Sequence, residues 1–325
     1  AALSESGKVV LSSVGNPQDS IDIEHGGTIK RAAFFDDAHL LTIDDTSIRL
    51  VRTDTGQVVR DFTAGSTLRD GNASAITNRV VGILESGSAR LWSGRLGEPI
   101  ADWTGLGAIE STVFSDDGQH VLVHDSSGQV QIFAAETGER IDELSEGLEA
   151  STISFAGDGR YVLGWSAEGK IIVRDVVAGL TRLVMDYSWD IAGAVLAHDG
   201  SRILLWGNDD HVVRVVDVDD SQVANTLRHT QKIRGATFDD YPDRAWTWSD
   251  DGTVRLRSLD DGSEIKRFSH SGGVTEIAFS EDGERMIALT VTREGVLWDT
   301  LTGLRLASLN VGRIDGWAMT PDASV

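Results

Sequence analysis

The chain has 325 residues, with 29 Lys and Arg against 51 Asp and Glu, and a formal charge of −22. This excess of carboxylates opposes binding to nucleic acid and to anionic membranes, and it favours basic partners. Because cysteine is absent, thiol catalysis, disulfide frameworks and cysteine-based zinc sites are excluded.

The opening 28 residues read as part of a repeat and not as a leader. The run Ser4–Asn16 aligns with Ser249–Asp261, and the run Ser20–Phe34 aligns with Ile265–Phe279. The amino terminus lacks the charged-then-apolar pattern of a signal peptide. It also lacks an initiator Met, which is expected of a processed form or of a domain from a longer protein. We expect the chain to begin near the end of the second strand of a repeat.

Beyond this segment, one frame recurs at intervals of about 41 residues, in which an apolar run ends near a Phe and is followed by a turn. The frame predicts first strands at Ile29–Phe34, Leu68–Ala75, Ile109–Phe114, Ser151–Phe155, Ile191–Leu196, Ile233–Phe238, Val274–Phe279 and Ile314–Met319. A period of about 40–45 residues with four strands is typical of propeller blades.

The clearest repeat is Gly273–Gly312, where apolar residues alternate in four short runs and no helical period occurs. The predicted strands are Val274–Phe279, Arg285–Leu289, Val296–Trp298 and Arg305–Leu309. The turns between them are Glu281-Asp282-Gly283, Arg293-Glu294-Gly295 and Thr300-Leu301-Thr302-Gly303.

The predicted fold is therefore an all-β, eight-bladed β-propeller with four antiparallel strands per blade, formed by a single domain over residues 1–325. The blades are assigned to 29–67, 68–108, 109–149, 150–190, 191–231, 232–272, 273–313, and 314–325 together with 1–28. In this last blade the two terminal segments close the ring, which removes exposed sheet edges and brings the termini together.

Two blades depart from the common frame. The second is the least regular, with strands predicted near Arg79–Leu84, Ala89–Ser93 and Glu98–Trp103. The fifth has Val218-Asp219-Asp220-Ser221 as its third turn, without glycine. Throughout the chain, paired aspartates fall in predicted turns, where their side chains can accept hydrogen bonds from the local backbone.

The repeats resemble those of the WD-repeat propeller family. The resemblance is carried by Phe279-Ser280-Glu281-Asp282-Gly283, Val296-Leu297-Trp298-Asp299 and Thr302-Gly303, and it extends over nearly the whole chain. It implies a non-catalytic scaffold that binds proteins or peptides, of the divergent kind found in bacteria, either alone or as the sensor or docking domain of a larger protein.

The sequence also departs from the family pattern. At the end of the third strand, where the family has a Trp-Asp pair, the pair survives only at Trp298-Asp299, and the Gly-His pair before the first strand is reduced to His25, His229 and His270. In the family these residues form a buried hydrogen-bond relay. We therefore expect most blades to lack the relay and to pack mainly through apolar contacts.

The candidate binding patch is Asp186, Tyr187, Trp189 and Asp190, in the connection between the fourth and fifth blades. Aromatic side chains flanked by carboxylates suit a basic, partly apolar peptide. The alternative, that both aromatics fold onto the sheet below, is equally open. The other tryptophans are expected to pack between blades: Trp92, Trp103, Trp165, Trp206, Trp298 and Trp317, with Trp246 and Trp248 sharing one face.

No catalytic residue, metal site or cofactor is predicted. His120 and His124 share a strand face, but further ligands are missing, and Asp217-Val218-Asp219-Asp220 lacks the Gly and the Glu of a calcium loop. An enzymatic alternative is a propeller similar to quinone-dependent dehydrogenases. That family has a docking Trp where this chain has Phe62 and Leu144.

We expect a protein or peptide partner, basic in charge, and no binding to nucleic acid or membranes. No apolar run approaches the ~20 residues that a membrane-spanning helix needs. The expected state is a cytoplasmic monomer.

Overall fold

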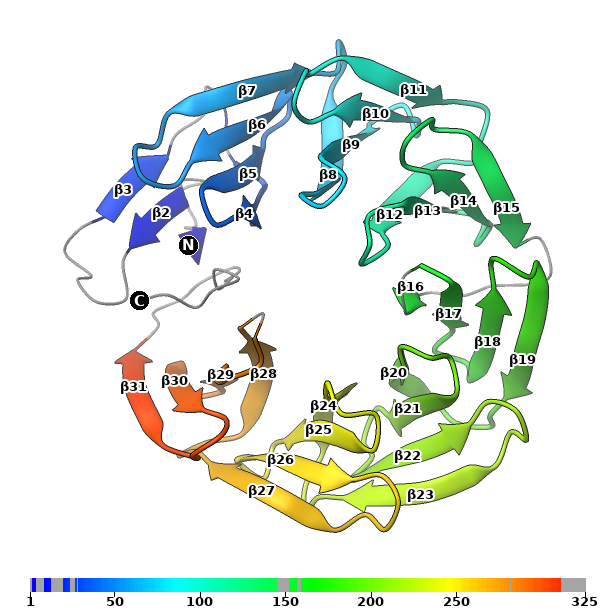
Figure 1. The fold of residues 1–325 in the computed structure, drawn as a ribbon, viewed down its shortest axis with the longest axis vertical. Helices are drawn as coiled ribbons and strands as arrows, with labels where there is room; N and C mark the ends of the chain where they lie inside the picture. Colours follow the sequence, from blue (N-terminus) through cyan, green and yellow to red (C-terminus); the bar gives the residue numbers. More distant parts are fainter. Residues whose placement is uncertain are drawn as a thin grey trace. The chain divides into compact units, whose positions relative to one another are not determined.

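The computed structural model describes residues 2–3, 9–12, 20–23, 27, 29–144, 152–156, 159–280 and 282–310. The chain divides into two compact units, one formed by Ala1–Gly147 with Arg313–Val325 and the other by Leu148–Gly312. The described residues of both units form only strands, turns and bends, and each unit contains four antiparallel sheets (Figure 1).

In the first unit, a three-stranded sheet is followed by three four-stranded sheets. The three-stranded sheet has β1 (Ala2–Leu3), β2 (Val9–Ser12) and β3 (Ser20–Ile23). The next has β4 (Arg31–Asp36), β5 (His39–Ile43), β6 (Ser47–Arg52) and β7 (Val58–Thr63). Then come β8 (Leu68–Ser74), β9 (Arg79–Leu84), β10 (Ala89–Ser93) and β11 (Pro99–Trp103), and finally β12 (Ile109–Phe114), β13 (His120–Asp125), β14 (Val130–Ala134) and β15 (Arg140–Leu144).

The second unit consists of four four-stranded sheets. The first two are β16 (Thr152–Ala156), β17 (Tyr161–Trp165), β18 (Lys170–Asp175) and β19 (Leu180–Asp186), then β20 (Ile191–Leu196), β21 (Arg202–Gly207), β22 (Val212–Asp217) and β23 (Val223–Arg228). The last two are β24 (Ile233–Phe238), β25 (Arg244–Ser249), β26 (Thr253–Ser258) and β27 (Glu264–Ser269), then β28 (Val274–Phe279), β29 (Arg285–Thr290), β30 (Glu294–Asp299) and β31 (Arg305–Asn310).

The predicted period is confirmed, and four first strands have the predicted bounds, namely β12, β20, β24 and β28. The irregular second repeat also has strands where the alternation placed them. Most other bounds differ by one residue, and the starts of two strands differ by two. β4 begins at Arg31 instead of Ile29, and β30 begins at Glu294, two residues before the predicted Val296.

The second error has a local cause. Arg293 adopts φ 63°, and its amide donates to the Thr290 carbonyl at 2.9 Å, so the turn closes at Arg293. The Glu294 amide then bonds the Thr290 hydroxyl at 3.2 Å. Of the three residues expected to form the turn, Arg293 does so, whereas Glu294 and Gly295 already belong to the strand.

The strand predicted at Ile314–Met319 lies outside the described residues, as do His25 and Trp317. The three amino-terminal strands pair in the order β1-β2-β3, as expected for the second, third and fourth strands of a blade. The single domain, the blade assignments and the closure of the ring by both ends of the chain remain predictions.

Successive sheets pack face to face through alternating apolar side chains. In β21, Ile203 and Leu205 join the core cluster shared with the β16–β19 sheet, whereas Leu204 and Trp206 join the cluster shared with the β24–β27 sheet. This alternation follows from the two-residue period of a strand, which sends neighbouring side chains to opposite faces. Each inner sheet of the unit is thereby apolar on both faces.

Tryptophans fill these interfaces as predicted wherever they are described. Trp92, Trp103, Trp206 and Trp246 are buried, and Trp165 and Trp298 are partly buried against core clusters. Trp246 and Trp248 both contact the cluster between the β24–β27 and β28–β31 sheets. Trp248 lies so close to Gly235 in β24 that a Cβ there would come within 2.0 Å of the ring.

The third turn of the repeat requires a residue with positive φ. Glycine supplies it in six repeats, at positions 56, 97, 138, 179, 262 and 303. In the β20–β23 sheet the same turn has Ser221, with φ 61°. The neighbouring aspartates cap the turn as predicted, since Asp217 accepts from the Asp219 amide and Asp220 from the Gln222 amide, each at 2.9 Å.

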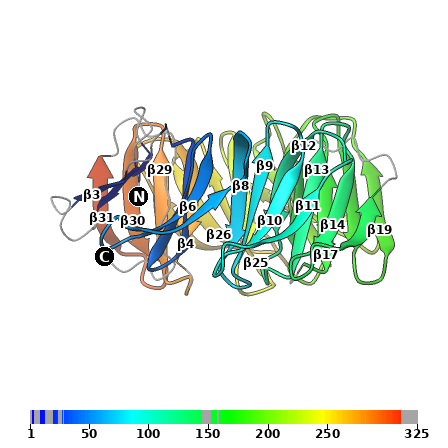
Figure 2. The same ribbon diagram turned by 90° about the horizontal axis from the view of Figure 1, so that it is seen from above.

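The antiparallel order fixes which loops share one end of a sheet. The turn between the second and third strands lies at the same end as the connection that enters the first strand. Figure 2 shows the strands side-on, with loops at both ends. In the β20–β23 sheet, this rule places the 187–190 connection next to the 208–211 turn.

Candidate functional site

Of the predicted patch, Asp186 ends β19, and Tyr187, Trp189 and Asp190 lie in the connection between β19 and β20, where the repeat frame placed the two aromatic residues. Two backbone hydrogen bonds tie this connection to the preceding sheet. The Tyr187 amide donates to the Gly169 carbonyl at 2.8 Å, and the Ile191 amide donates to the Ala167 carbonyl at 3.1 Å. Gly169 has φ 105° and has no room for a side chain, because a Cβ would approach the Tyr187 carbonyl oxygen to 2.1 Å.

Tyr187 and Trp189 are partly buried and pack against each other, with ring centroids 5.0 Å apart and planes tilted by 46°. Both contact the apolar cluster between the β16–β19 and β20–β23 sheets. The Tyr187 hydroxyl points to Met185, donating to its sulfur at 3.8 Å, and burial raises the pKa of this tyrosine. Of the two orientations considered from the sequence, Tyr187 therefore adopts the one in which the ring folds onto the sheet.

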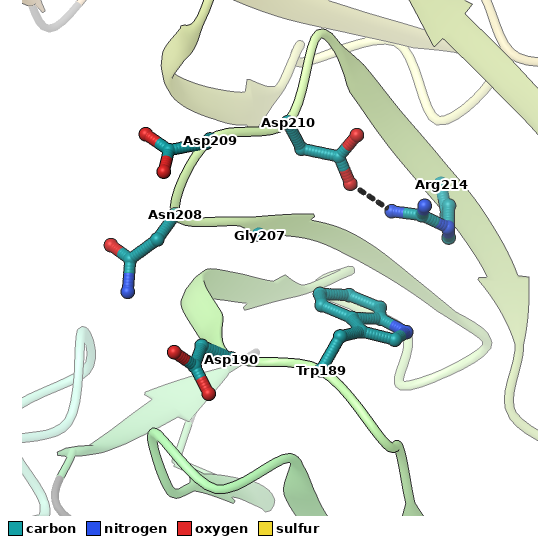
Figure 3. A pocket seen from close by; sticks show the side chains of 7 residues that line it. All are labelled: Trp189, Asp190, Gly207, Asn208, Asp209, Asp210 and Arg214. Atoms are coloured by element: carbon teal, nitrogen blue, oxygen red, sulfur yellow. Dashed lines mark hydrogen bonds and ion pairs between the residues drawn. The ribbon is translucent and has the colours of Figure 1, made fainter.

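Trp189 and Asp190 also line an open pocket of about 600 Å³, together with Gly207, Asn208, Asp209, Asp210 and Arg214 (Figure 3). Gly207 lets the indole approach the backbone, since a Cβ at this position would lie 3.1 Å from the ring. The volume lies within the range of about 300–1,000 Å³ that small-ligand pockets occupy. Asp186 is exposed and does not line the pocket.

The pocket carries three carboxylates and one guanidinium. Arg214 forms an ion pair with Asp210, and its guanidinium carbon lies 4.6 Å from the centre of the Trp189 ring. Asp209 is almost fully exposed and lies 3.3 Å from the Lys232 ammonium. Asp190 is exposed, and its carboxylate forms no hydrogen bond or ion pair within the described part of the chain. The lining is thus acidic, with one aromatic wall.

The sequence did not indicate the other five members of this lining: Gly207, Asn208, Asp209, Asp210 and Arg214. Asp209-Asp210 was interpreted only as turn chemistry. The length of the second turn gives a signal. Four residues separate β21 from β22, whereas three residues separate β25 from β26. The additional residue in the 208–211 turn enlarges the loop next to Trp189.

The relay expected to be lost from most blades is present in the β24–β27 sheet. The fully buried His229 side chain lies with Nδ1 3.0 Å from Asp251 Oδ2 and with Nε2 2.8 Å from the Thr247 hydroxyl. Arg255 extends this cluster, with its Nη2 2.8 Å from Asp251 Oδ2. In the next sheet, the described residues retain the link in which Trp298 Nε1 donates to His270 Nε2 at 2.9 Å.

Burial shapes the protonation of this cluster. Burial lowers the pKa of His229 to about 4, outweighing the opposing effect of the Asp251 carboxylate. For Asp251, burial would raise the pKa, but hydrogen bonds from Thr253 and Thr230 outweigh it and hold the pKa at about 2. At neutral pH the pair is therefore a neutral imidazole and a carboxylate.

His120 and His124 both belong to β13, and the described residues contain no group of three or more side chains suited to hold a metal ion. Nor do they include a helix that is long and apolar enough to cross a bilayer.

Comparisons with known proteins address the fold. No family model matches the chain, and no curated protein matches it. Among solved structures, the crystal structure of the computationally designed Ika8 protein is similar, with a TM-score of 0.70 and 20% identity, covering 90% of each chain. The C-terminal WD40 domain of Sif2 is similar with a TM-score of 0.63 and 18% identity, covering 82% of this chain and 79% of that domain.

The chain has a WD40-like β-propeller fold. At these identities the likeness establishes architecture only. In this fold the blades are the four-stranded sheets described above, and the pocket lies on the loops of one blade, β20–β23.

Proposed function

We propose that this propeller is a non-catalytic scaffold that binds a protein or peptide, and that the pocket around Trp189 forms the centre of its binding surface. The observation that carries the proposal is the pocket itself, where a partly exposed indole lies beside three carboxylates on the loops of a rigid sheet. Loops on a rigid scaffold are common positions for recognition residues. Aromatic residues are enriched among those that dominate binding energy.

The charge of the protein supports a basic partner. The chain has an excess of 22 carboxylates over Lys and Arg, and the pocket lining has the same sign. Such a field accelerates association with basic partners and opposes association with nucleic acid and anionic membranes. We propose that the propeller binds its partner either on its own, as a cytoplasmic monomer, or as the docking or sensor domain of a larger protein. The full reading frame of the gene would distinguish these two cases.

The test is to immobilise the protein, identify what it captures and compare two aromatic substitutions. Trp189→Ala removes the indole of the pocket, and Tyr241→Ala is the matched control. Tyr241 is 59% exposed in the turn between β24 and β25, which lies at the opposite end of the sheets. We expect the first variant to lose a partner that the second retains. Equal capture by both variants, with melting temperatures unchanged, would place the binding surface elsewhere.

The enzymatic alternative makes a separate prediction. A quinone-dependent propeller would carry a chromophore absorbing in the visible range and a stoichiometric metal ion. We expect the purified protein to have an absorption spectrum accounted for by its aromatic residues, and mass analysis to find no bound metal. A bound quinone would overturn the scaffold assignment.

A further inference from the structure

The neighbouring repeats of the chain indicate what the pocket binds. In the β24–β27 sheet, the first turn aspartate, Asp250, accepts from Arg234 Nε at 2.7 Å. In the β4–β7 sheet the corresponding pair is Asp45 and the Lys30 ammonium, which form an ion pair. Lys30 and Arg234 occupy the same place in the repeat, one residue after the Ile that opens the first-strand frame, at Ile29 and Ile233.

The β20–β23 sheet has the acid of this pair but not the cation. Its turn has Asn208 and Asp209 where the β24–β27 sheet has Asp250, because Ile191 pairs with Gly207 as Ile233 pairs with Ser249. The residue after Ile191 is Ala192, which is exposed and carries no charge. The ion pair found in two other sheets thus has no cation from its own sheet here, and the nearest ammonium to Asp209 is that of Lys232 before β24, at 3.3 Å.

A second position in the same pocket has changed charge. The residue before the first strand is Lys232 in the β24–β27 sheet and Asp190 in the β20–β23 sheet. One cation is therefore replaced by alanine and another by a carboxylate, at two places that flank the same turn. Figure 3 shows Asp190, Asn208 and Asp209 on the side of the pocket away from Arg214.

Arg214 does not compensate for this change. It corresponds to Arg255 in the next sheet, and each arginine forms an ion pair with the aspartate four residues before it, Asp210 or Asp251. Asp251 also bonds His229, whereas Tyr187, which corresponds to His229, turns its hydroxyl to Met185. Arg214 therefore pairs with Asp210 and lies over Trp189. The carboxylates of Asp190 and Asp209 lie on the open side, where the exposed Asp209 also faces the Lys232 ammonium at 3.3 Å.

We propose that the pocket binds an arginine side chain of the partner, with Asp190 and Asp209 as its carboxylate partners and Trp189 as its apolar wall. This inference rests on the proposed function and specifies its partner. A guanidinium has five donors in a planar arrangement, so it can bond two carboxylates from different loops, which the smaller ammonium group of lysine does less well. One exposed ion pair contributes little, and the site therefore requires both carboxylates.

The test uses three short peptides, acetyl-Gly-Arg-Gly-amide, its lysine analogue and its citrulline analogue, which is the neutral isostere of arginine. Binding is followed by NMR through the indole N–H signal of Trp189, identified with Trp189→Phe. We expect saturable shifts with the arginine peptide, weaker binding of the lysine peptide, and binding of the citrulline peptide at least about tenfold weaker, which corresponds to 1.4 kcal/mol.

The decisive variant supplies the missing cation. Ala192→Arg places an arginine where Arg234 lies in the next sheet, and we expect it to pair with the turn and to weaken the arginine peptide about tenfold or more. Ala192→Gln, of similar length without charge, should bind as the wild type does within about twofold, as should Asp186→Asn outside the pocket. Asp190→Asn combined with Asp209→Asn should abolish the preference for arginine over citrulline.

The proposal is overturned if the citrulline peptide binds as tightly as the arginine peptide, or if Ala192→Arg leaves binding unchanged. This outcome differs from failure of the proposed function. If Trp189→Ala abolishes capture of a partner while the arginine peptide shows no charge-dependent binding, the scaffold function holds and the arginine assignment is wrong.

Discussion

A single backbone position shows how strictly the repeat controls its turns. Ser221 adopts φ 61° where six other repeats have glycine. A side chain in the left-handed region costs about 1–2 kcal/mol because its Cβ crowds the following carbonyl. We expect Ser221→Gly to raise the free energy of unfolding by about 0.5–1 kcal/mol, after allowing for the greater freedom of glycine in the unfolded chain.

Urea denaturation measures this change. Ser221→Ala is the control, because alanine retains the Cβ and should give no such gain. If both substitutions have the same effect, the left-handed conformation is not the source of strain, and loss of the hydroxyl would account for the result.

His229 provides a prediction for pH dependence. Its pKa is about 4 in the folded protein, below the ordinary value of 6.5, so the unfolded state binds more protons between these pH values. Stability should therefore fall as the pH decreases from about 6.5 towards 4, by at most about 1.4 kcal/mol per pH unit from this group. The charged groups facing the imidazole are Asp251, Arg255 and Arg257.

His229→Gln removes this titration while it keeps a polar side chain. The variant should be less stable at pH 7 because the bond to Asp251 or Thr247 is weakened. Its stability should decline less steeply than that of the wild type between pH 6.5 and 4.5, as measured by denaturant midpoints. Parallel pH profiles would show that the pKa of His229 does not differ between the folded and unfolded states.

At the scale of a strand, close approach of glycine and tryptophan determines how blades pack. Gly235 in β24 lies beneath Trp248, and a Cβ at 2.0 Å from the ring would force the indole to move. Gly235→Ala should therefore destabilise the protein by about 1–3 kcal/mol, the typical cost of overpacking, although alanine suits a strand better than glycine.

A double substitution distinguishes this clash from other causes. Trp248→Leu makes room above position 235, so Gly235→Ala should cost much less in that background than in the wild type. Additive effects on the free energy of unfolding would show that the alanine acts through another contact.

Elements were predictable from sequence to the extent that alternation and turn residues define them. The first strands β12, β20, β24 and β28 have the expected bounds because an apolar residue opens each and Phe or Leu ends it. The start of β30 was missed because Arg293 takes the conformation that Gly252 takes in the preceding sheet. An arginine gives no turn signal in a sequence, whereas glycine does.

The candidate site was predictable only in part. Trp189 and Asp190 were found because they interrupt the repeat with an aromatic residue and a carboxylate. Asp209 and Arg214 were not predicted to line the site, because they reach the pocket only when the antiparallel strand order brings the 208–211 turn next to the 187–190 connection. For Tyr187 the sequence left both orientations open, and its ring packs against Met185 and the neighbouring sheet.

At the scale of the whole chain, the joint blade formed by both ends remains the main prediction from sequence. The alignment of Ser4 with Ser249 places Leu3 opposite Gly316, by analogy with the pairing of Trp248 and Gly235. The chain has no cysteine, so Leu3→Cys with Gly316→Cys introduces one defined pair. Mild oxidation should give an intramolecular disulfide, detected as faster migration on a non-reducing gel.

Each single-cysteine variant serves as a control and should give no such species. A double variant that forms only intermolecular dimers would show that the two ends do not share a sheet. Formation of the bond should also raise the melting temperature, because the link constrains the unfolded chain.

The pairing of one connection with one turn has an evolutionary consequence. Every four-stranded sheet that the structure describes has its second turn at the end where the chain enters its first strand, so the position occupied by Trp189 and Asp209 has a counterpart in both neighbouring sheets. Exchange of a few surface residues in one blade can create or abolish a binding specificity while the apolar interfaces are preserved. A chain of this kind can diversify what it recognises one blade at a time.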